Sequence, residues 1–228
     1  MAGDPADRMA ASRAAMVSRQ LRDRGIADER VLGVMANLPR ERFLPDANRG
    51  HAYDDAAVPV GFGQTISQPF IVARMTELLR IAPGDRVLDV GTGTGYQAAV
   101  LAGLGATVMS IERNRELAAT ARERLDRLGL GENVEIRVGD GSVGAADGAP
   151  WDGIVVGAAA PSVPEALREQ LAIGARLVIP VGPRDRQELL SVERTAPNDW
   201  VERSDGPCIF VPLVGAGGFA EDPRARTS

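Results

Sequence analysis

The stretch at residues 86–112, RVLDVGTGTGYQAAVLAGLGATVMSIE, constrains the fold more than any other part of the chain. It begins with a short apolar run carrying Asp89, which is typical of a buried strand. Three glycines then fall within five residues, and an alanine-rich run over 96–104 has the composition of a helix. These glycines are Gly91, Gly93 and Gly95. Because only a backbone without side chains makes so tight a turn and lets a ligand approach a helix N-terminus, the stretch predicts a strand, turn and helix that open an α/β unit.

A second apolar run, 107–111, stops at Glu112 and so presents an acidic side chain 17 residues after Gly95. An acid at the end of the neighbouring strand suits the hydroxyls of a ribose. Dinucleotide-binding folds carry G-x-G-x-x-G, whereas this chain has G-x-G-x-G with an acid two residues before the first glycine. The difference favours an adenosyl ligand without a pyrophosphate. The alternative, a glycine-rich turn that binds nothing, is disfavoured because Asp89 and Glu112 both fall where a nucleoside site needs them.

Apolar runs and helical patterns alternate through the middle of the chain. Further strands are expected over 134–138, 151–156, 177–181, 188–194 and 208–213, and helices over 12–25, 28–37, 70–79, 113–128 and 164–170. Gly25 is expected to end the first helix and Asp28 to cap the second. The alternation predicts a mostly parallel, doubly wound α/β sheet of the Rossmann-like type, with two helices before its first strand and late strands that pair antiparallel.

Composition excludes several kinds of chemistry. All 26 basic residues are arginine, so the chain has no lysine for a Schiff base, for anchoring pyridoxal phosphate or for a P-loop. One histidine, His51, and one cysteine, Cys208, cannot build a multi-histidine metal site or an internal disulfide, and we expect no metal. Cys208 lies in an apolar run and is expected in the core rather than as a nucleophile. The net charge of -5 argues against a general nucleic-acid binder.

The chain shows no membrane or secretion signal by pattern. Its first 25 residues alternate in charge, and nowhere do 18 apolar residues run together. We therefore expect a cytoplasmic protein that does not bind membranes, and a monomer. Residues 1–11 and 220–228 are polar and are expected to form frayed tails.

Residues 45–69 contain no periodic apolar pattern, and a loop of this length inside a compact domain is usually functional or disordered; we favour a functional role. Its end gathers four hydrogen-bonding side chains around the apolar Ile66. These are Gln64, Thr65, Ser67 and Gln68. Ser67 could also cap the helix expected over 70–79, with Pro69 in its first turn, and the two roles are compatible.

A second acid follows the strand expected over 134–138, which ends in Gly139-Asp140-Gly141. Open α/β sheets bind ligands at such strand ends, and Asp140 could contact an adenine amino group. The alternative is an ordinary Asp-Gly turn.

An adenosyl ligand without phosphates, in a chain with no metal cluster and no nucleophile paired with a base, indicates S-adenosylmethionine and methyl transfer. A carboxylate acceptor suits this chain because carboxylates are ionised at neutral pH and need no general base. Methylation of amide or adenine nitrogen usually uses an Asn-Pro-Pro-Tyr-type motif after the fourth strand, where this chain has GAAAP at 157–161.

Five segments resemble the protein-L-isoaspartate O-methyltransferase family. They are MVSRQLRDRGIADERVL (16–32), GFGQTISQPFIVARM (61–75), VLDVGTGTGYQAAVLA (87–102), VGAAAPSVPEALREQLAIGARLVIPVG (156–182) and FVPLVG (210–215). The glycine motif is common to many methyltransferases, whereas GQTISQP and GAAAPSVP are much narrower. The resemblance implies one class I S-adenosylmethionine-dependent methyltransferase domain over 12–219. Its parts would be a helical flank (12–45), an acceptor loop (46–69), a cofactor-binding core (70–182) and C-terminal strands (183–215).

The resemblance also implies an activity and a site. The enzyme would methylate the free carboxylate of L-isoaspartyl residues in damaged proteins and peptides, and the ester would close to a succinimide whose hydrolysis returns some aspartate. Ser67 is the implied active-site residue, orienting the acceptor carboxylate and the donor methyl rather than attacking covalently. The implied contacts to S-adenosylmethionine, or its product S-adenosylhomocysteine, are Thr65, Ile66, Ser67, Asp89, Gly91, Thr92, Gly93, Gly95, Glu112, Asp140 and Gly141. The implied substrate contacts are Ile66, Ser67, Val211, Pro212 and Leu213.

Three other functions are compatible with parts of the pattern. A methyltransferase for a small-molecule carboxylate would share every cofactor residue and differ in the loop 58–69 and the late strands. A non-catalytic protein that binds isoaspartyl sites or S-adenosylmethionine is disfavoured by the intact Ser67 and glycine turn. A nicotinamide dehydrogenase is disfavoured by G-x-G-x-G.

Overall fold

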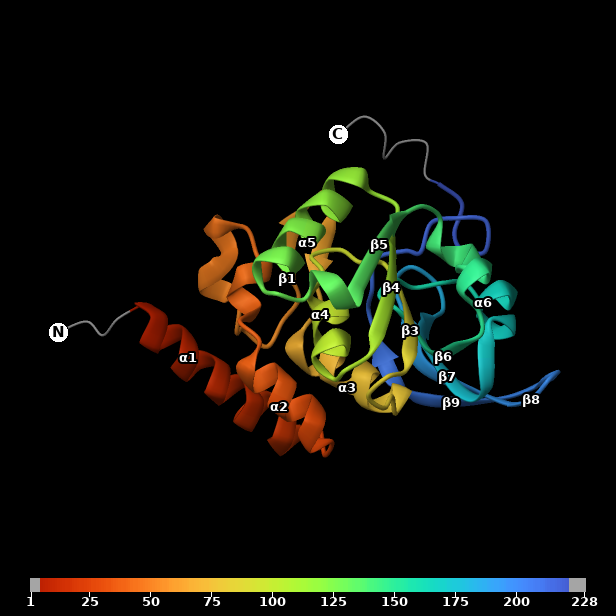
Figure 1. Cartoon of the computed structure of the whole chain (residues 1–228), viewed down its shortest axis with the longest axis horizontal. Helices are drawn as coiled ribbons and strands as arrows, with labels where there is room; N and C mark the ends of the chain where they lie inside the picture. Colours follow the sequence, from red (N-terminus) through yellow and green to blue (C-terminus); the bar gives the residue numbers. More distant parts are fainter. Residues whose placement is uncertain (1–4, 222–228) are drawn as a thin grey trace.

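The fold is built on one seven-stranded sheet, seen in a computed structural model that describes residues 5–221 (Figure 1). The strand order is β5-β4-β3-β6-β7-β8-β9; the first five strands are parallel, and β8 and β9 pair antiparallel. The strands are β3 (Arg86–Val90), β4 (Thr107–Glu112), β5 (Val134–Val138), β6 (Trp151–Val156), β7 (Leu171–Val181), β8 (Gln187–Ala196) and β9 (Asp199–Cys208). This order confirms the predicted doubly wound sheet with antiparallel late strands.

Two hydrophobic clusters, one on each face, explain why the central strands are apolar at consecutive positions. In β3, Val87 belongs to one cluster and its neighbour Leu88 to the other, and both are fully buried. The first cluster includes residues of the helices α2 (Glu29–Asn37), α3 (Pro69–Leu79), α4 (Tyr96–Gly103) and α5 (Arg115–Arg127). The second includes Leu167 of the short helix α6 (Glu165–Glu169).

The N-terminal helices begin earlier than predicted. Helix α1 covers Pro5–Ala15 and continues as a π-helical turn over Met16–Leu21 and a 3-10 turn over Arg22–Arg24. Residues 5–11, expected in a frayed tail, are therefore helical, while 1–4 and 222–228 lie outside the described residues. Gly25 ends the run at φ 95°, and the Asp28 side chain accepts a hydrogen bond from the Arg30 amide, so both predicted boundary residues are confirmed.

The stretch 45–69, predicted as an irregular loop, contains a small antiparallel hairpin. A 3-10 turn over Asp46–His51 precedes β1 (Val58–Gly61), which pairs with β2 (Gln64–Ile66). These strands escaped prediction because they are four and three residues long, too short to show an alternating pattern. Ser67 does not cap α3: Gln68 holds that position without a side-chain bond.

The end of the sheet also differs from prediction. The last strand covers 199–208, and the expected strand over 208–213 is wrong except at Cys208. Most of β9 is exposed at the edge of the sheet, so its sequence is polar and lacks an apolar alternation. The following residues run beside the β6 exit: the Ala159 amide donates to Val211, and the Leu213 amide donates to Ala159. No helix within the described residues combines the length and apolar character needed to cross a membrane.

Candidate active site

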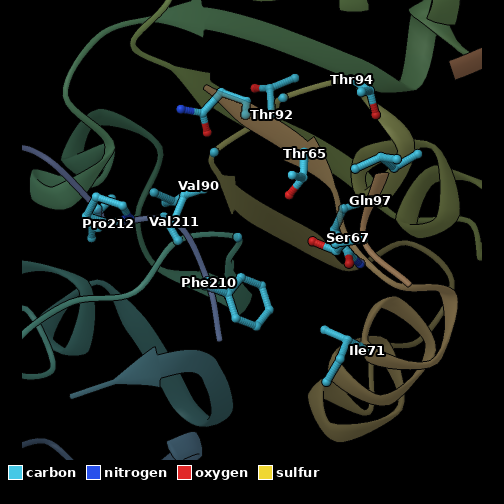
Figure 2. Close-up of a pocket in the computed structure, with 18 of the residues that line it drawn as sticks. Thr65, Ser67, Ile71, Val90, Thr92, Thr94, Gln97, Phe210, Val211 and Pro212 are labelled. Atoms are coloured by element: carbon cyan, nitrogen blue, oxygen red, sulfur yellow. The ribbon is translucent and has the colours of Figure 1, made fainter. Parts of the chain in front are cut away.

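A cavity of about 1100 Å³ opens at the carboxyl ends of β3, β4 and β6. This is where the strand order reverses, because β4 and β5 extend from one side of β3 and β6 and β7 from the other. Its walls come from the glycine-rich loop after β3, the segment around Ser67, and the extended segment 207–214. Figure 2 shows Thr65 and Ser67 in the space between Thr92 and the segment that carries Phe210. The cavity thus joins the three motifs that sequence analysis singled out.

The glycine-rich loop needs its glycines for two different reasons. Gly91, Gly93 and Gly95 all have positive φ, at 91°, 53° and 89°, where side chains are strained. A Cβ on Gly95 would also lie 3.3 Å from the Ala121 Cβ of α5. Gly91 and Gly93 line the cavity, whereas Gly95 does not. Gly95 therefore has a packing role against α5, and its predicted contact with the cofactor stays a prediction.

Glu112 lies in the cavity wall and is only 7% exposed. Its Oε2 accepts a hydrogen bond from the Gly93 amide at 2.8 Å, and its Oε1 accepts one from the Asn114 amide at 2.9 Å. Each carboxylate oxygen has a second lone pair, so both can still accept hydroxyl donors. The residue thereby ties the end of β4 to the glycine loop, with its acceptors at the cavity.

Asp89 lies behind this wall. It is fully buried and does not line the cavity, and its predicted contact with the cofactor stays a prediction. Its Oδ2 accepts a 2.6 Å bond from the Ser110 hydroxyl, which is 2.5 Å from the Thr92 hydroxyl oxygen. Oδ1 has no partner among the described residues. Burial, opposed by the Ser110 bond, raises the pKa of Asp89 to about 7. Asp89 therefore supports the glycine loop through Ser110 and Thr92.

Asp140 does not line the cavity, and its carboxylate is hydrogen-bonded within the neighbouring loops; its predicted contact with the cofactor stays a prediction. Its Oδ1 accepts hydrogen bonds from the amide and hydroxyl of Ser142, and its Oδ2 accepts one from the Ala216 amide at 2.8 Å. The Ser142 hydroxyl accepts a further bond from the Gly217 amide at 2.9 Å. Gly141, in contrast, lines the cavity. The Asp-Gly turn is thus the latch that holds the segment after β9 in place.

The facing wall carries the predicted acceptor residues. Thr65 is exposed, Ser67 is half-buried, and Ile66 is buried at 3% exposure; all three line the cavity. Gln97, from the first turn of α4, lines it beside them and donates to the Thr76 hydroxyl at 2.9 Å. The structure therefore gathers two hydroxyls and one amide on this wall.

The third wall contains the predicted substrate residues Val211, Pro212 and Leu213. Cys208 lies there too; it is half-buried and packs against the hydrophobic core, so the predicted core position is confirmed in part. Burial, with a smaller contribution from Glu188, raises the pKa of its thiol to about 11, which makes it a poor nucleophile.

Several residues around this cavity were not predicted. Tyr96 and Arg184 line it, and Arg40 lies behind it, bonded to the Ser67 carbonyl. Phe62 stands at the hairpin turn with φ 54° and a 56% exposed side chain. The glycines on both sides of Phe62 were the available signal for a tight hairpin turn. Arg40 gave no signal, since a single arginine resembles a surface residue in sequence.

This fold and cavity define a class I S-adenosylmethionine-dependent methyltransferase: the loop lacks the dinucleotide spacing, and an acid ends the next strand at the cavity. The family model described as Protein-L-isoaspartate(D-aspartate) O-methyltransferase (PCMT) matches residues 11–218. The chain therefore belongs to that family of enzymes.

Individual relatives agree with this assignment. A protein-L-isoaspartate O-methyltransferase 2 of Marinobacter nauticus is 52% identical over 208 residues, which cover 91% of this chain and 94% of that protein. A protein-L-isoaspartate O-methyltransferase of Koribacter versatilis is 53% identical over 211 residues, covering 92% and 94%. A solved protein-L-isoaspartate O-methyltransferase superposes with a TM-score of 0.81 at 30% identity, covering 90% of this chain and 67% of that one. A putative Plasmodium falciparum member, solved with S-adenosyl-L-homocysteine, superposes with a TM-score of 0.75 at 25% identity. The match covers 89% of this chain and 98% of that one.

Proposed function

We propose that this cavity binds S-adenosylmethionine beside an L-isoaspartyl residue of a damaged protein or peptide and transfers the methyl group to its free carboxylate. One observation carries the proposal: the Ser67 segment and the glycine-rich loop line the same cavity. At about 1100 Å³ the cavity is at the upper end of small-molecule sites and has room for a cofactor with a peptide segment.

The cofactor side of the cavity fits an adenosyl group in its donor set. The open backbone at Gly91 and Gly93 allows close approach, and Glu112 offers acceptors to the ribose hydroxyls. Gly141 lines the adenine side without a side chain; a Cβ there would lie 2.5 Å from Val90 Cγ1. Bound there, S-adenosylmethionine supplies an electrophilic methyl group and its own leaving group.

The residues of this chain then have to align the acceptor. Ser67 donates its hydroxyl to one oxygen of the substrate carboxylate and leaves the other free to face the methyl group. The carboxylate is ionised at neutral pH, so no base has to remove a proton. Alignment of two bound reactants lowers the barrier by about 7–11 kcal/mol in favourable cases. Amides at the start of α3, next to Ser67, add favourable partial charge for the anion.

Two synthetic peptides test the reaction. They differ only in carrying L-isoaspartate or L-aspartate at one position, and labelled S-adenosylmethionine is the donor. Base-labile label on the isoaspartyl peptide alone is the expected result. Label on neither peptide, with cofactor binding intact, would instead favour another carboxylate acceptor or a binding protein.

Ser67→Ala tests the acceptor wall in the same assay. We expect a fall in kcat/KM of about tenfold to a hundredfold, since one hydrogen bond to a charged group is lost. The dissociation constant of S-adenosylhomocysteine serves as the control. Unchanged turnover together with unchanged peptide affinity would remove Ser67 from the mechanism.

The domain limits and the setting of the enzyme belong to the same proposal. Residues 12–219 form the methyltransferase domain, and the enzyme acts as a cytoplasmic monomer that binds neither nucleic acid nor membrane. Size-exclusion chromatography with light scattering tests the oligomeric state. The net charge of the chain, -5, gives it no general attraction for nucleic acids or other polyanions.

A further inference from the structure

Arg40 is a fully buried arginine directly behind the acceptor wall. It opens a short 3-10 helix over Arg40–Phe43 and is 0% exposed. Its Nε donates to the Ala52 carbonyl at 2.7 Å, and its Nη2 donates to the Ser67 carbonyl at the same distance. Nη1 is buried without an acceptor among the described residues. The guanidinium thus makes two bonds to backbone carbonyls, its Nη1 has no acceptor within the described residues, and its side-chain neighbour is the uncharged Tyr96.

No carboxylate within the described residues forms an ion pair with Arg40. The adjacent Glu41 is turned elsewhere: it accepts a short bond from the Tyr53 hydroxyl and lies 3.9 Å from Arg13. Arginine keeps its charge even when burial disfavours it, and a buried, unpaired charge is expensive. A cation kept under these conditions calls for a function that compensates the cost.

The position of Arg40 connects this charge to the cavity. Arg40 does not line the cavity, but the two groups it contacts there do: Ser67, through its carbonyl, and Tyr96, whose ring centre lies 4.8 Å from the guanidinium carbon. One layer of protein therefore separates an unneutralised cation from the wall that receives the substrate carboxylate. Low-polarity surroundings leave such an interaction weakly screened.

We propose that Arg40 is a positioning residue for the methyl acceptor, fixing the Ser67 segment through its carbonyl and lending the acceptor wall a positive charge that favours a carboxylate over a neutral group. This inference rests on the proposed function and deepens it, because it explains how a chain with a net charge of -5 selects an anionic acceptor. The charge at this wall makes the cavity prefer a carboxylate to a neutral group. The substrate carboxylate then pairs with the Arg40 guanidinium across the wall.

The test compares binding of two competing peptides. One carries L-isoaspartate. The other carries isoasparagine, in which an amide replaces the free carboxylate, so that it has nearly the same shape without the charge. Inhibition constants are measured for wild type, Arg40→Met, Arg40→Gln and Arg40→Lys, together with kcat, KM and the dissociation constant of S-adenosylhomocysteine. Arg194→Met is the matched control, since Arg194 also donates to backbone carbonyls, those of Glu169, Leu171 and Pro197.

Wild type should bind the carboxylate peptide at least about tenfold more tightly than the amide, as expected when a charged hydrogen-bonding group is lost. Arg40→Met and Arg40→Gln should lose most of this ratio, with S-adenosylhomocysteine binding changed less than about twofold. Arg40→Lys should keep the ratio because it keeps the charge, while kcat falls because a single ammonium group lacks the planar fork that holds the two carbonyls in Arg40. Arg194→Met should keep the ratio whatever it does to stability.

Several results would overturn the inference. A ratio that survives in Arg40→Met and Arg40→Gln shows that the charge is not used. If wild type binds the two peptides equally well, the charge of Arg40 is not used either. This comparison needs no variant, so it can overturn the inference even if the neutral variants do not fold. If wild type does not methylate the isoaspartyl peptide at all, it is the proposed function that fails.

Discussion

The buried carboxyl of Asp89 should make the chain less stable as pH rises, and replacement by asparagine should remove that dependence. Burial raises its pKa from 3.8 to about 7, against the opposing bond from Ser110. Between these two values the folded state holds a proton that the unfolded state has already released. Folding is therefore favoured below the unfolded pKa, and this contribution is lost as pH rises through about 7.

The magnitude follows from the same two values. At about 1.4 kcal/mol for each tenfold change in proton affinity, the full difference corresponds to about 4 kcal/mol. Most of it, about 3 kcal/mol, should develop between about pH 5 and pH 8. Asp89→Asn keeps an oxygen to accept the Ser110 bond but never ionises, so its stability should exceed that of wild type increasingly as pH rises.

Urea unfolding of both proteins at a series of pH values measures this difference. Titrating groups that do not interact with residue 89 cancel in the comparison; Glu112, whose charge adds to the raised pKa of Asp89, is the neighbour that does interact with it. Asp185→Asn is the control, because Asp185 is exposed and its removal relieves no buried charge. A difference between wild type and Asp89→Asn that stays constant from pH 5 to pH 8 would refute the argument that burial controls this group.

Three further substitutions and one chemical probe test other features of the fold and site. Gly103→Ala should lower the unfolding free energy by about 1–3 kcal/mol, because the new Cβ would lie 2.7 Å from Val34 Cγ1, where helices α2 and α4 meet. Gly33→Ala should raise the unfolding free energy by about 0.5–1 kcal/mol, because Gly33 lies in the interior of α2 and a Cβ there would have nothing within 4 Å. Urea titration measures both changes, and a change of the opposite sign in either variant would contradict this packing. Glu112→Gln should weaken S-adenosylhomocysteine binding by about tenfold or more in calorimetry, since an amide nitrogen would face the Gly93 or Asn114 amide; unchanged affinity would exclude Glu112 from the site. Cys208, with a thiol pKa of about 11, should react with iodoacetamide near pH 8 about a hundredfold more slowly than an ordinary cysteine, and a normal rate would show that the thiol is not shielded.

The centre of the fold was predictable because its signals are local. The unit β3, turn and α4 combines an apolar run, clustered glycines and a helical composition within 86–104, and each glycine has the positive φ that its position requires. Asp28 and Pro69 likewise occupy the first-turn positions that their chemistry favours. In these cases the residues that determine the local structure lie within the same short stretch of sequence as the structure itself.

Elements that depend on distant partners were not predictable in the same way. Strand β9 is defined by pairing with β8, and its own residues are mostly exposed and polar. The hairpin of β1 and β2 is too short for a period.

Side-chain direction was the other limit in the site. An acid at the end of a strand can line the cavity, as Glu112 does, or hydrogen-bond within its own loop, as Asp140 does to Ser142. Both arrangements have the same sequence pattern. Arg40 shows the same difficulty for burial, because only the fold reveals that it is enclosed.

The latch formed by Asp140 and Ser142 has a consequence for when activity can arise. It holds residues 216 and 217, and the segment 207–214 just before them forms a whole wall of the cavity. Once β9 has been synthesised, every strand of the sheet is present, but residues 209–214 of the third wall are not. Methyl transfer should therefore be acquired only after residues 209–217 have been added, and trimming by a carboxypeptidase past residue 214 should abolish catalysis before it unfolds the sheet.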